Sequence, residues 1–332
     1  MKILVMHPND YTTATFFPAF IKQQLSDMGE VYWNPGEEGF TEAQLIDVIG
    51  DKDILLGGWD MPTFTSNVFD AAKNLKYIGQ IGGSIKHYIK SEEVFDRGIA
   101  VSNAAAGVAK YVAEGALTFI LAALKDLYTI NTTMKIDKGD PSGALYGDTL
   151  FGKKVGLIGF GKVGRQMLPL LAPFDTTVSV FDPYLTCDEA EKLGVIKREL
   201  ADLLQDSDII SLHAPNTPET KNMLNLDTLA LIKPGALLVN TARAAIIDEL
   251  ALLSELKRGR IKAALDVFWK EPLPVEHELR RIPGVLISPH SIAAAAQQRP
   301  EQAQMVIDDI KFFLDGKTPI NNIDRAIYRI MA

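Results

Sequence analysis

Residues 156–167 read GLIGFGKVGRQM, and this stretch decides the fold. Gly159, Gly161 and Gly164 have the spacing G-x-G-x-x-G, which opens the helix of dinucleotide-binding βαβ units. The same stretch contains most of G-x-x-x-x-G-K-[ST], the loop that holds a nucleoside triphosphate. The residues around the glycines discriminate between these two kinds of phosphate site.

The triphosphate loop fails at two points. Its pattern requires a Ser or Thr hydroxyl for magnesium after the Gly-Lys pair, but Val163 follows Lys162. Its cradle would also contain Leu157 and Ile158, which continue the apolar run of Val155 and therefore belong to a strand.

The dinucleotide turn has every part that it needs. KKVGLIGF (153–160) is a predicted strand, and the N-terminal amides of the following helix would meet a pyrophosphate, although Pro169 is expected to kink that helix. Asp182 closes the next strand, 18 residues after Gly164. There its carboxylate can accept from a ribose 2′-hydroxyl and would repel a 2′-phosphate. No Lys or Arg lies between residues 166 and 191, so the sequence favours NAD over NADP.

Short apolar runs alternate with longer amphipathic stretches along the chain, which is typical of wound α/β domains with parallel sheets. Two series of strands are predicted, separated by helical stretches such as 14–27 and 65–74. The strands of the first series are 2–6, 31–34, 53–58, 76–82 and 99–104. Those of the second series are 153–160, 176–182, 207–214, 235–242, 261–268 and 285–289.

Three segments connect or follow these series. A long Ala-rich helical pattern at 105–130 is expected to pass from one domain to the other. Gly, Pro and Asp interrupt residues 131–150, so a loop or arm is predicted there. The amphipathic run from about residue 294 to residue 314 is expected to pack back onto the first domain.

The length and composition favour two domains. With 332 residues, 47% of them hydrophobic, the chain can bury a large core. The predicted fold class is α/β with two wound parallel-sheet domains. A Rossmann cofactor domain at 105–293 is expected to be inserted in a flavodoxin-like substrate domain formed by 1–104 plus 294–332.

Charge and cysteine content argue against several partner classes. The 34 basic and 42 acidic side chains leave a formal net charge of −8 without a basic tract, so no nucleic acid is expected as a partner. The apolar start MKILVM ends at His7, and no later apolar run is judged long enough for a span, so no membrane is expected. Cys187 is the only cysteine, which favours a reducing, cytoplasmic location.

Three titratable side chains directly follow predicted strands of the second series: Arg243, Glu271 and His290. In open parallel sheets, ligands bind beyond the carboxyl ends of the strands. An oxidoreductase acting on a 2-oxo acid needs a cation for the carboxylate, an acid for the carbonyl oxygen and a carboxylate partner for that acid. Each residue alone would pass for a solvated loop residue, but the set can supply all three functions.

Other residues after strands have open interpretations. The five histidines lack metal-ligand spacing, so no metal is expected, and His213 is either structural or lines the cofactor site. His7, Trp59 and Met61 follow strands of the first series. They are equally compatible with a substrate pocket and with packing.

Taken together, these segments resemble the D-isomer-specific 2-hydroxyacid dehydrogenase family, whose members include phosphoglycerate, D-lactate and glyoxylate or hydroxypyruvate enzymes. The resemblance covers most of the chain, and the order of its segments is specific to the family. The segments are NAAAGVAKYVAE (103–114), VGLIGFGKVGR (155–165), HAPNTPET (213–220), NTARAAIIDELAL (240–252), LDVFWKEP (265–272) and SPH (288–290).

The resemblance implies a role for each matching residue. Arg243 would bind and polarise the substrate, while Glu271 would pair with His290, which would exchange a proton with the substrate oxygen. Asp266 would lie near the nicotinamide carboxamide and Val112 near the ring. The cofactor-binding residues implied are Gly159, Gly161, Lys162, Val163, Gly164, Asp182, His213, Pro215, Thr220, Thr241, Ala242, Asp266 and Val112.

The first domain would supply the other half of the substrate site. Gly82, Gly83 and Ser84 would offer backbone amides to the substrate carboxylate, and Trp59 would line the pocket. Family members are typically dimers joined through their cofactor domains. The resemblance therefore implies a homodimer, in which the arm at 131–150 would take part.

The chain departs from the family pattern at three points. Where the family often shows G-x-G-x-D, this motif ends in Lys86. Ala244 stands where glycine usually follows the arginine, and Ser291 stands where an apolar residue often follows the histidine. These changes bear on the substrate rather than on the reaction class, and Lys86 either favours a second acidic group on the substrate or is solvated.

The sequence thus predicts an NAD-dependent enzyme that interconverts a 2-oxo acid and its D-2-hydroxy acid by direct hydride transfer. The alternative is an NAD(H)-sensing binding protein that controls assembly without useful turnover, against which the complete Arg, Glu and His set argues. A short-chain dehydrogenase is disfavoured because no Tyr is followed four residues later by Lys.

Overall fold

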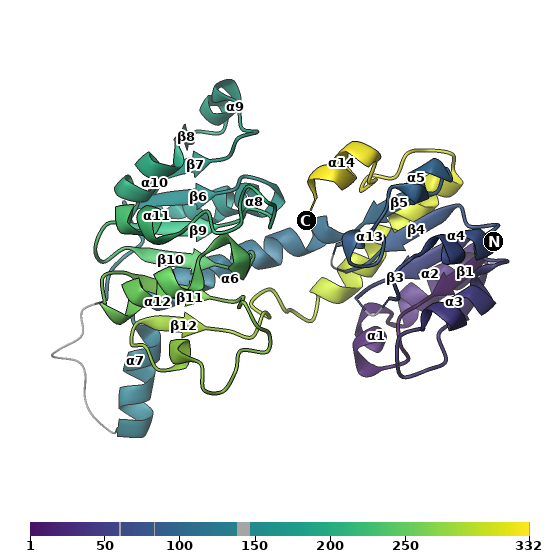
Figure 1. Ribbon diagram of the computed structural model, residues 1–332, viewed down its shortest axis with the longest axis horizontal. Coiled ribbons are helices and arrows are strands. Elements are labelled where there is room, and N and C mark those ends of the chain that lie inside the picture. Colours follow the sequence, from purple (N-terminus) through teal and green to yellow (C-terminus); the bar gives the residue numbers. More distant parts are fainter. Residues whose placement is uncertain (60, 83, 138–146, 332) are drawn as a thin grey trace. The chain divides into compact units, whose positions relative to one another are not determined.

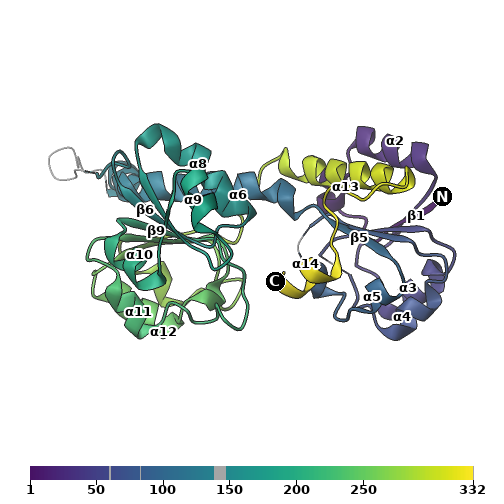
Figure 2. The same ribbon diagram turned by 90° about the horizontal axis from the view of Figure 1, so that it is seen from above.

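The structure is a computed structural model that describes residues 1–59, 61–82, 84–137 and 147–331. The chain divides into two compact units (Figure 1). The first unit comprises Met1–Val108 and Ala295–Ala332, and the second comprises Ala109–Ala294. Each unit contains a parallel β-sheet with helices on both faces (Figure 2). The predicted α/β fold with two wound parallel sheets is confirmed.

The strands of the first unit follow the order β2-β1-β3-β4-β5, so the chain changes its direction across the sheet between β1 and β3. This is the strand order of flavodoxin-like folds. Each strand overlaps the stretch predicted for it. The strands are β1 (Lys2–Val5), β2 (Glu30–Trp33), β3 (Ile54–Gly57), β4 (Tyr77–Gln80) and β5 (Ala100–Asn103).

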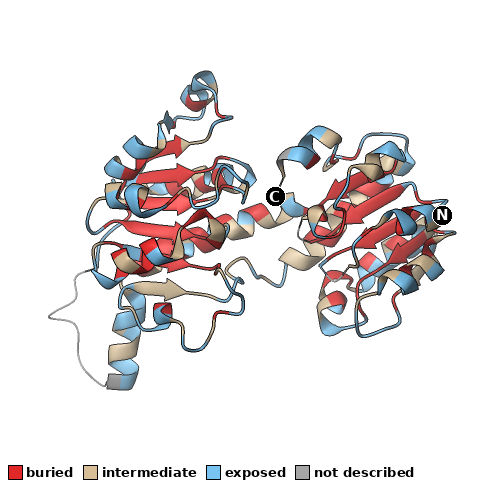
Figure 3. Cartoon of the chain, in the orientation of Figure 1, coloured by how far each residue is buried: buried red, intermediate tan, exposed pale blue. Residues whose placement is uncertain are grey.

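Helices cover both faces of the first sheet because its strands carry apolar side chains on both sides (Figure 3). Ile3 and Val5 of β1 pack with α1, α2 and α13, whereas Leu4 packs with α3, α4, α5 and α14 on the opposite face. The helices are α1 (Tyr11–Phe16), α2 (Ala19–Met28), α3 (Glu42–Ile49), α4 (Ser66–Ala71), α5 (Glu93–Asp96), α13 (Gln298–Leu314) and α14 (Arg325–Ile330).

The late helix α13 belongs to the core of the first unit. A Cβ atom on Gly79 of β4 would lie 2.3 Å from Cγ1 of Val306, so α13 presses directly onto the middle of the sheet. Val306, Ile307 and Ile310 are fully buried together with Ile3. Residues separated by some 300 positions in the sequence therefore form one hydrophobic layer.

The strands of the second unit follow the order β12-β11-β10-β9-β6-β7-β8. The chain enters at β6, moves outward to β8, and returns to β9 on the other side of β6, which is the arrangement of Rossmann domains. The strands are β6 (Lys154–Ile158), β7 (Thr177–Phe181), β8 (Ile196–Lys197), β9 (Ile209–Leu212), β10 (Leu237–Asn240), β11 (Lys262–Leu265) and β12 (Val285–Ile287).

Two helical layers cover the second sheet. Val155 and Leu157 of β6 pack with α6, α8 and α9, and Ile158 packs with α10, α11 and α12 on the other face. The helices are α6 (Ala105–Leu124), α7 (Leu127–Thr132), α8 (Lys162–Leu171), α9 (Cys187–Lys192), α10 (Leu200–Asp206), α11 (Leu226–Leu231) and α12 (Glu249–Lys257).

Several predicted element boundaries were wrong. The helix at 14–27 is divided into α1 and α2, because Pro18 stands between them as the N-cap of α2. Strand β8 was missed, because its two residues are exposed and carry no apolar run. Pro169 lies near the end of α8, which stops at Leu171 and continues as a 3₁₀ turn.

The helical pattern at 105–130 also needed correction. It is interrupted at Asp126, whose φ of 49° lies in the left-handed region, and the helix resumes as α7. Residues 133–137 form a π-helical turn rather than the start of a loop. The rest of the predicted arm, residues 138–146, lies outside the described residues.

Helix α6 qualifies the expectation that the chain lacks a span-length apolar run. Within the described residues it is 20 residues long and apolar enough to cross a membrane, by length and composition only. Ala113, Ala116 and Ile120 of α6 are fully buried in the core of the second unit. A core helix of a soluble protein meets the same criteria, so this finding is weak evidence for a membrane span.

The packing of α13 gives a first prediction. Replacing the fully buried Ile307 with Ala should lower the free energy of unfolding by about 2–5 kcal/mol, because it leaves a cavity between α13 and the sheet. Urea unfolding followed by tryptophan fluorescence measures this change. The matched control is Ile320→Ala, at a side chain that is 72% exposed, which should cost less than about 0.5 kcal/mol. Equal losses in both variants would contradict this account of the core.

Candidate active site

The glycine turn connects β6 to α8 and leaves open space at the start of the helix. Gly159 has a φ of 90°, and a Cβ atom there would lie 2.5 Å from the amide nitrogen of Ala214, so this position requires glycine. A Cβ atom on Gly164 would lie 2.6 Å from the carbonyl oxygen of Gly159, which explains the close packing of α8. Among the residues that the structure describes, a Cβ atom on Gly161 would meet no atom within 4 Å, and no side chain caps α8. The uncapped amides beside this open space fit a pyrophosphate.

Asp182 follows β7, the neighbour of β6, and joins the two strand ends. Its Oδ2 atom accepts a hydrogen bond of 2.6 Å from the amide of Phe160, and its Oδ1 atom accepts one of 2.8 Å from the amide of Tyr184. Each carboxylate oxygen can accept a further bond. The predicted ribose acceptor therefore also fixes the glycine turn.

Buried polar atoms without partners lie at the carboxyl ends of β9 and β10. Among the described residues, neither ring nitrogen of His213 nor the hydroxyl of Thr241 has a hydrogen-bond partner. Burial lowers the pKa of His213 to about 4, so its ring is neutral near pH 7. Such unsatisfied groups fit a site completed by a ligand.

The remaining predicted cofactor residues differ in what the structure shows of them. The hydroxyl of Thr220 donates to the carbonyl of Pro215 over 2.6 Å, so it holds the turn that follows β9. Lys162 is the first residue of α8, and Val163, the second, packs against the core. Val112 lies half-buried on α6.

Arg243 stands on a turn shaped by a buried asparagine. Asn240, the last residue of β10, donates from Nδ2 to the carbonyl of Arg243 over 3.0 Å and accepts from the amide of Ala242 over 3.0 Å. The guanidinium of Arg243 is exposed and donates to the carbonyl of Ala242 over 2.7 Å. The backbone is thus fixed while the guanidinium keeps further donors for a ligand.

His290 and Glu271 form a hydrogen-bonded pair. The distance between His290 Nδ1 and Glu271 Oε2 is 2.8 Å, and the amide of Phe268 donates to Glu271 Oε1 over 2.9 Å. Partial burial by itself would raise the pKa of Glu271, but these two bonds and the charges of His290 and Arg243 outweigh it and hold the pKa below its usual value. A pocket of about 300 Å³ lies beside the pair.

Asp266 holds the turn that carries His290. Its Oδ1 atom accepts three hydrogen bonds, from the hydroxyl of Ser288 (2.5 Å) and from the amides of Ser291 (2.9 Å) and Ile292 (3.1 Å). Burial raises the pKa of Asp266, and these donors oppose that shift. His290 itself has a φ of 53°, a strained conformation for a residue with a side chain, which the surrounding hydrogen bonds stabilise.

Strands β10, β11 and β12 are neighbours in the sheet, which explains why these side chains lie together. Arg243, Asp266, Glu271 and His290 all follow the carboxyl ends of these strands. The ends of parallel strands meet at one edge, so residues far apart in sequence form one cluster. Among the described residues, no group of three His, Cys, Asp or Glu side chains could hold a metal ion.

The predicted substrate residues of the first unit follow β3 and β4. Gly82 is buried, and a Cβ atom there would lie 2.6 Å from the ring of Trp59, so the two residues are in contact. Trp59 also packs on Phe16, with ring centroids 5.5 Å apart, and remains 47% exposed. The side chain of Ser84 accepts a hydrogen bond from a backbone amide in the following turn. Gly83 lies outside the described residues.

Sequence reasoning missed two buried polar residues that shape these loops. Asn240 ends β10, and Gln80 ends β4, where its side chain donates to the carbonyl oxygens of Gly58 and Gly82. Each interrupts an otherwise apolar strand at its last position. That interruption is the signal by which they could have been found, because a polar side chain at a buried strand end needs a local partner.

Comparisons with known proteins agree with the fold of the chain and identify its family. Residues 117–291 match the sequence profile described as D-isomer specific 2-hydroxyacid dehydrogenase, NAD binding domain. The D-3-phosphoglycerate dehydrogenase of Bacillus subtilis is 33% identical over 295 residues, which cover 85% of this chain and 55% of that protein. This chain thus spans about half the length of the phosphoglycerate dehydrogenases that it matches.

Two further relatives match over most of their length. The glyoxylate reductase of Thermofilum pendens is 32% identical over 303 residues, which cover 90% of this chain and 87% of that protein. Among solved structures, D-lactate dehydrogenase from Escherichia coli has a TM-score of 0.75 at 26% identity, covering 98% of this chain and 100% of that chain.

The open space at Gly161 gives a second prediction. Gly161→Val should fold normally, because a Cβ atom at this position meets no described atom within 4 Å, but it should weaken NADH binding about tenfold or more by occupying the space before α8. Titration of NADH fluorescence measures the affinity, and thermal unfolding measures the stability. Gly50→Val controls for unspecific effects on NADH affinity, because the φ of −58° at Gly50 suits any residue and a Cβ atom there would lie 3.4 Å from the carbonyl oxygen of Ala71, an ordinary contact. Unchanged NADH affinity in Gly161→Val would refute the assignment of the turn.

Proposed function

Since this chain belongs to the D-isomer specific 2-hydroxyacid dehydrogenase family and its second unit is an NAD-binding domain, we propose that it interconverts a 2-oxo acid and the corresponding D-2-hydroxy acid. The hydrogen bond between His290 and Glu271 carries this proposal. A carboxylate only accepts hydrogen bonds, so Nδ1 of His290 holds a proton and Nε2 is the atom left to exchange one with a substrate.

Each member of the cluster has a distinct role in reduction. Bound NADH supplies the hydride that reduces the carbonyl carbon. His290 donates a proton from Nε2 to the carbonyl oxygen, and the ionised Glu271 stabilises the protonated imidazole. Arg243 binds the substrate carboxylate with its free donors and polarises the carbonyl. In the oxidative direction, His290 accepts the hydroxyl proton.

We assign the other predicted residues to positioning. The backbone amides of Gly82, Gly83 and Ser84 would hold the substrate carboxylate, and Trp59 would line the pocket. Asp182 would bind the adenosine ribose and select NAD against NADP, since its carboxylate would repel a 2′-phosphate. Asp266 would orient the nicotinamide carboxamide with the Oδ2 atom, while Oδ1 holds the histidine turn.

The names of the relatives suggest which acids to test. Phosphoglycerate, glyoxylate and lactate enzymes are all similar to this chain, so D-3-phosphoglycerate, glyoxylate and pyruvate with the appropriate cofactor form a first panel. Robust change of NADH absorbance with any of them supports the proposal. NADH binding with a change of oligomeric state but without turnover would instead favour the NAD(H)-sensing alternative.

Substitutions at the cluster give a third prediction. His290→Gln should lower kcat about 10²–10⁴-fold, because the proton donor is lost. Arg243→Gln should lower kcat/KM about a hundredfold or more, because a two-pronged carboxylate contact is lost. NADH affinity should stay normal in both variants.

The chain offers a matched control for the histidine. His277 pairs with Glu249 over 2.8 Å in the same unit but outside the cluster, so His277→Gln removes a similar pair. Its turnover should stay within about twofold of the wild type. Near-normal turnover of His290→Gln or of Arg243→Gln would show that the assigned role is wrong.

We also propose that the protein is a cytoplasmic homodimer joined through its second units. Large apolar side chains that are 55–72% exposed support this contact: Leu127, Tyr128, Met134, Ile136 and Phe151. Four of them lie on α7 and the turn that follows it, and exposed apolar side chains concentrated on one segment are typical of a protein interface. The single cysteine, Cys187, is exposed and free, which suits a reducing compartment.

The proposed dimer gives a fourth prediction. The double substitution Tyr128→Lys and Ile136→Lys should convert the dimer to a monomer, because two charges would be buried without partners in the interface. Light scattering measures the mass. Leu250→Lys, at a side chain of the second unit that is 78% exposed, is the control and should leave the mass unchanged. A double variant that keeps the dimeric mass would place the interface elsewhere.

A further inference from the structure

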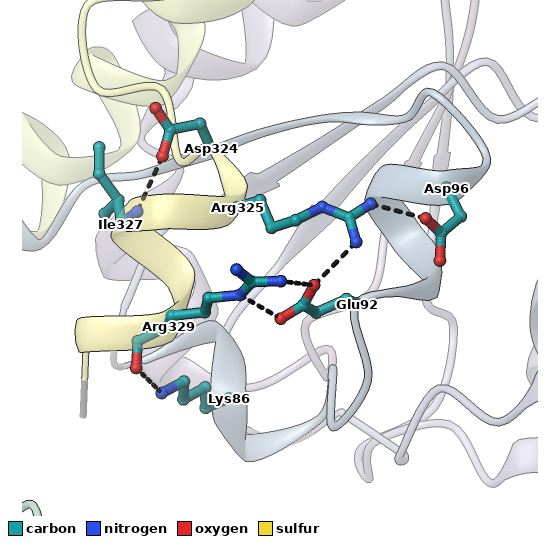
Figure 4. Close-up of polar contacts among 7 residues, drawn as sticks. All are labelled: Lys86, Glu92, Asp96, Asp324, Arg325, Ile327 and Arg329. Carbon is teal, nitrogen blue, oxygen red and sulfur yellow. Dashed lines mark hydrogen bonds and ion pairs between the residues drawn. The ribbon is translucent and has the colours of Figure 1, made fainter.

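Lys86, the residue that departs from the family pattern, contacts the C-terminal helix. Its ammonium group donates to the carbonyl oxygen of Arg329 over 3.4 Å (Figure 4). It also donates to the carbonyl oxygen of Met331 over 2.5 Å and lies 5.2 Å from the ring centroid of Tyr328. These carbonyls lie at the end of α14, where a helix leaves carbonyl groups unpaired and attracts cations. The structure thus shows a third role for Lys86, different from both that the sequence suggested.

A second set of contacts joins Glu92 and Asp96 to α14. Glu92 accepts hydrogen bonds from Arg325 (2.8 Å) and from two nitrogens of Arg329 (2.7 and 2.9 Å), and Arg325 also donates to Asp96 over 2.6 Å (Figure 4). The bonds from Arg329, and then those from Arg325, outweigh desolvation and lower the pKa of Glu92 to about 2. Glu92 is therefore ionised at neutral pH and is shared by two guanidinium groups.

Buried contacts fix α14 in addition to these exposed charges. Tyr328 is 6% exposed, its hydroxyl donates to the carbonyl of Ile89 over 2.8 Å, and its ring lies 5.4 Å from that of Phe95. Before α14, the amide of Ile323 donates to the carbonyl of Val101 in β5 over 2.8 Å. Exposed ion pairs alone contribute little, but together with a buried anchor they define one orientation of the helix.

Of these contacts, those of Lys86 come two residues after Ser84, and the others follow at residues 89–101. The 3₁₀ turn η1 (Ile85–His87) begins at Ser84, whose side chain accepts from the amide of Lys86 over 3.3 Å. On the other side of Ser84, Gln80 donates to the carbonyl of Gly82, and Tyr88 donates to Gln80 over 2.6 Å. Gly82 is therefore held by the end of β4, and the turn that begins at Ser84 is held by α14.

We propose that α14 positions Gly82 and Ser84 for the substrate carboxylate, with Lys86 and Glu92 as the positioning residues that connect α14 to this part of the chain. This inference rests on the proposed function, in which the backbone amides of these residues bind the carboxylate. Backbone amides bind a carboxylate well only when the backbone is fixed beforehand, since small displacements of binding groups are costly. The last residues of the chain thus tune substrate affinity without contacting the substrate.

The experiment compares Lys86→Met with Lys86→Arg in the full chain. Lys86→Met keeps the length of the side chain but loses the donor, whereas Lys86→Arg keeps a donor for the helix end. Two quantities are measured: amide hydrogen exchange of residues 81–90, and the KM for the best 2-oxo acid together with kcat and the affinity for NADH. The matched control is Lys76→Met, which breaks an exposed ion pair with Asp53 in the same unit.

We expect Lys86→Met to speed exchange in residues 81–90 and to raise KM about tenfold, with kcat and NADH affinity nearly unchanged. Lys86→Arg should keep exchange and KM close to their wild-type values, and Lys76→Met should show neither faster exchange nor a raised KM. Normal exchange of the β1 amides would show that the first unit remains folded.

The outcomes separate this inference from the proposed function. Unchanged exchange in Lys86→Met overturns the inference, and so does faster exchange with an unchanged KM, because Gly82 and Ser84 then do not serve the substrate. If the wild-type protein converts no 2-oxo acid, the proposed function fails. The exchange data alone then decide whether α14 holds this part of the chain.

Discussion

The close approach of three chain segments at Gly159 is the constraint on which the second unit depends. The turn leaves no room for a Cβ atom against Ala214, and its amide donates to the carbonyl of Phe181 over 2.9 Å. The glycine therefore lets the ends of β6, β7 and β9 come together beside the point where the strand order reverses. This junction creates the crevice beyond the strand ends in which a dinucleotide can lie.

Buried polar side chains at strand ends control the loops of both units. Asn240 shapes the turn of Arg243, Asp266 shapes the turn of His290, and Gln80 holds the carbonyl of Gly82. In each case a buried side chain at the end of a strand forms hydrogen bonds with backbone groups of the loop, which lack the partners that regular secondary structure would provide. The sheet thus fixes the geometry of the loops, and the loops remain free to carry chemistry.

Two residues show how a position can serve structure and site together. Asp266 uses one carboxylate oxygen for three donors around His290, which leaves the other oxygen for a ligand. Lys86 departs from the family pattern, yet its charge is satisfied by the carbonyl end of α14. A departure from a motif is therefore not necessarily a change of substrate, because a distant segment of the same chain can provide the partner of the substituted residue.

The sequence by itself determined the α/β class, every strand of the two sheets except β8, and the family, because apolar runs and the glycine spacing are local signals that need no partner. It also identified Arg243, Glu271 and His290 as candidates, since parallel strands bring their ends to one edge. Only the tertiary structure showed the break at Asp126, the exposed strand β8, the turn held by Thr220 and the contact of Lys86 with α14. These features depend on contacts between side chains and backbone atoms that no local pattern records, and the partners of Lys86 lie 243 and 245 residues away.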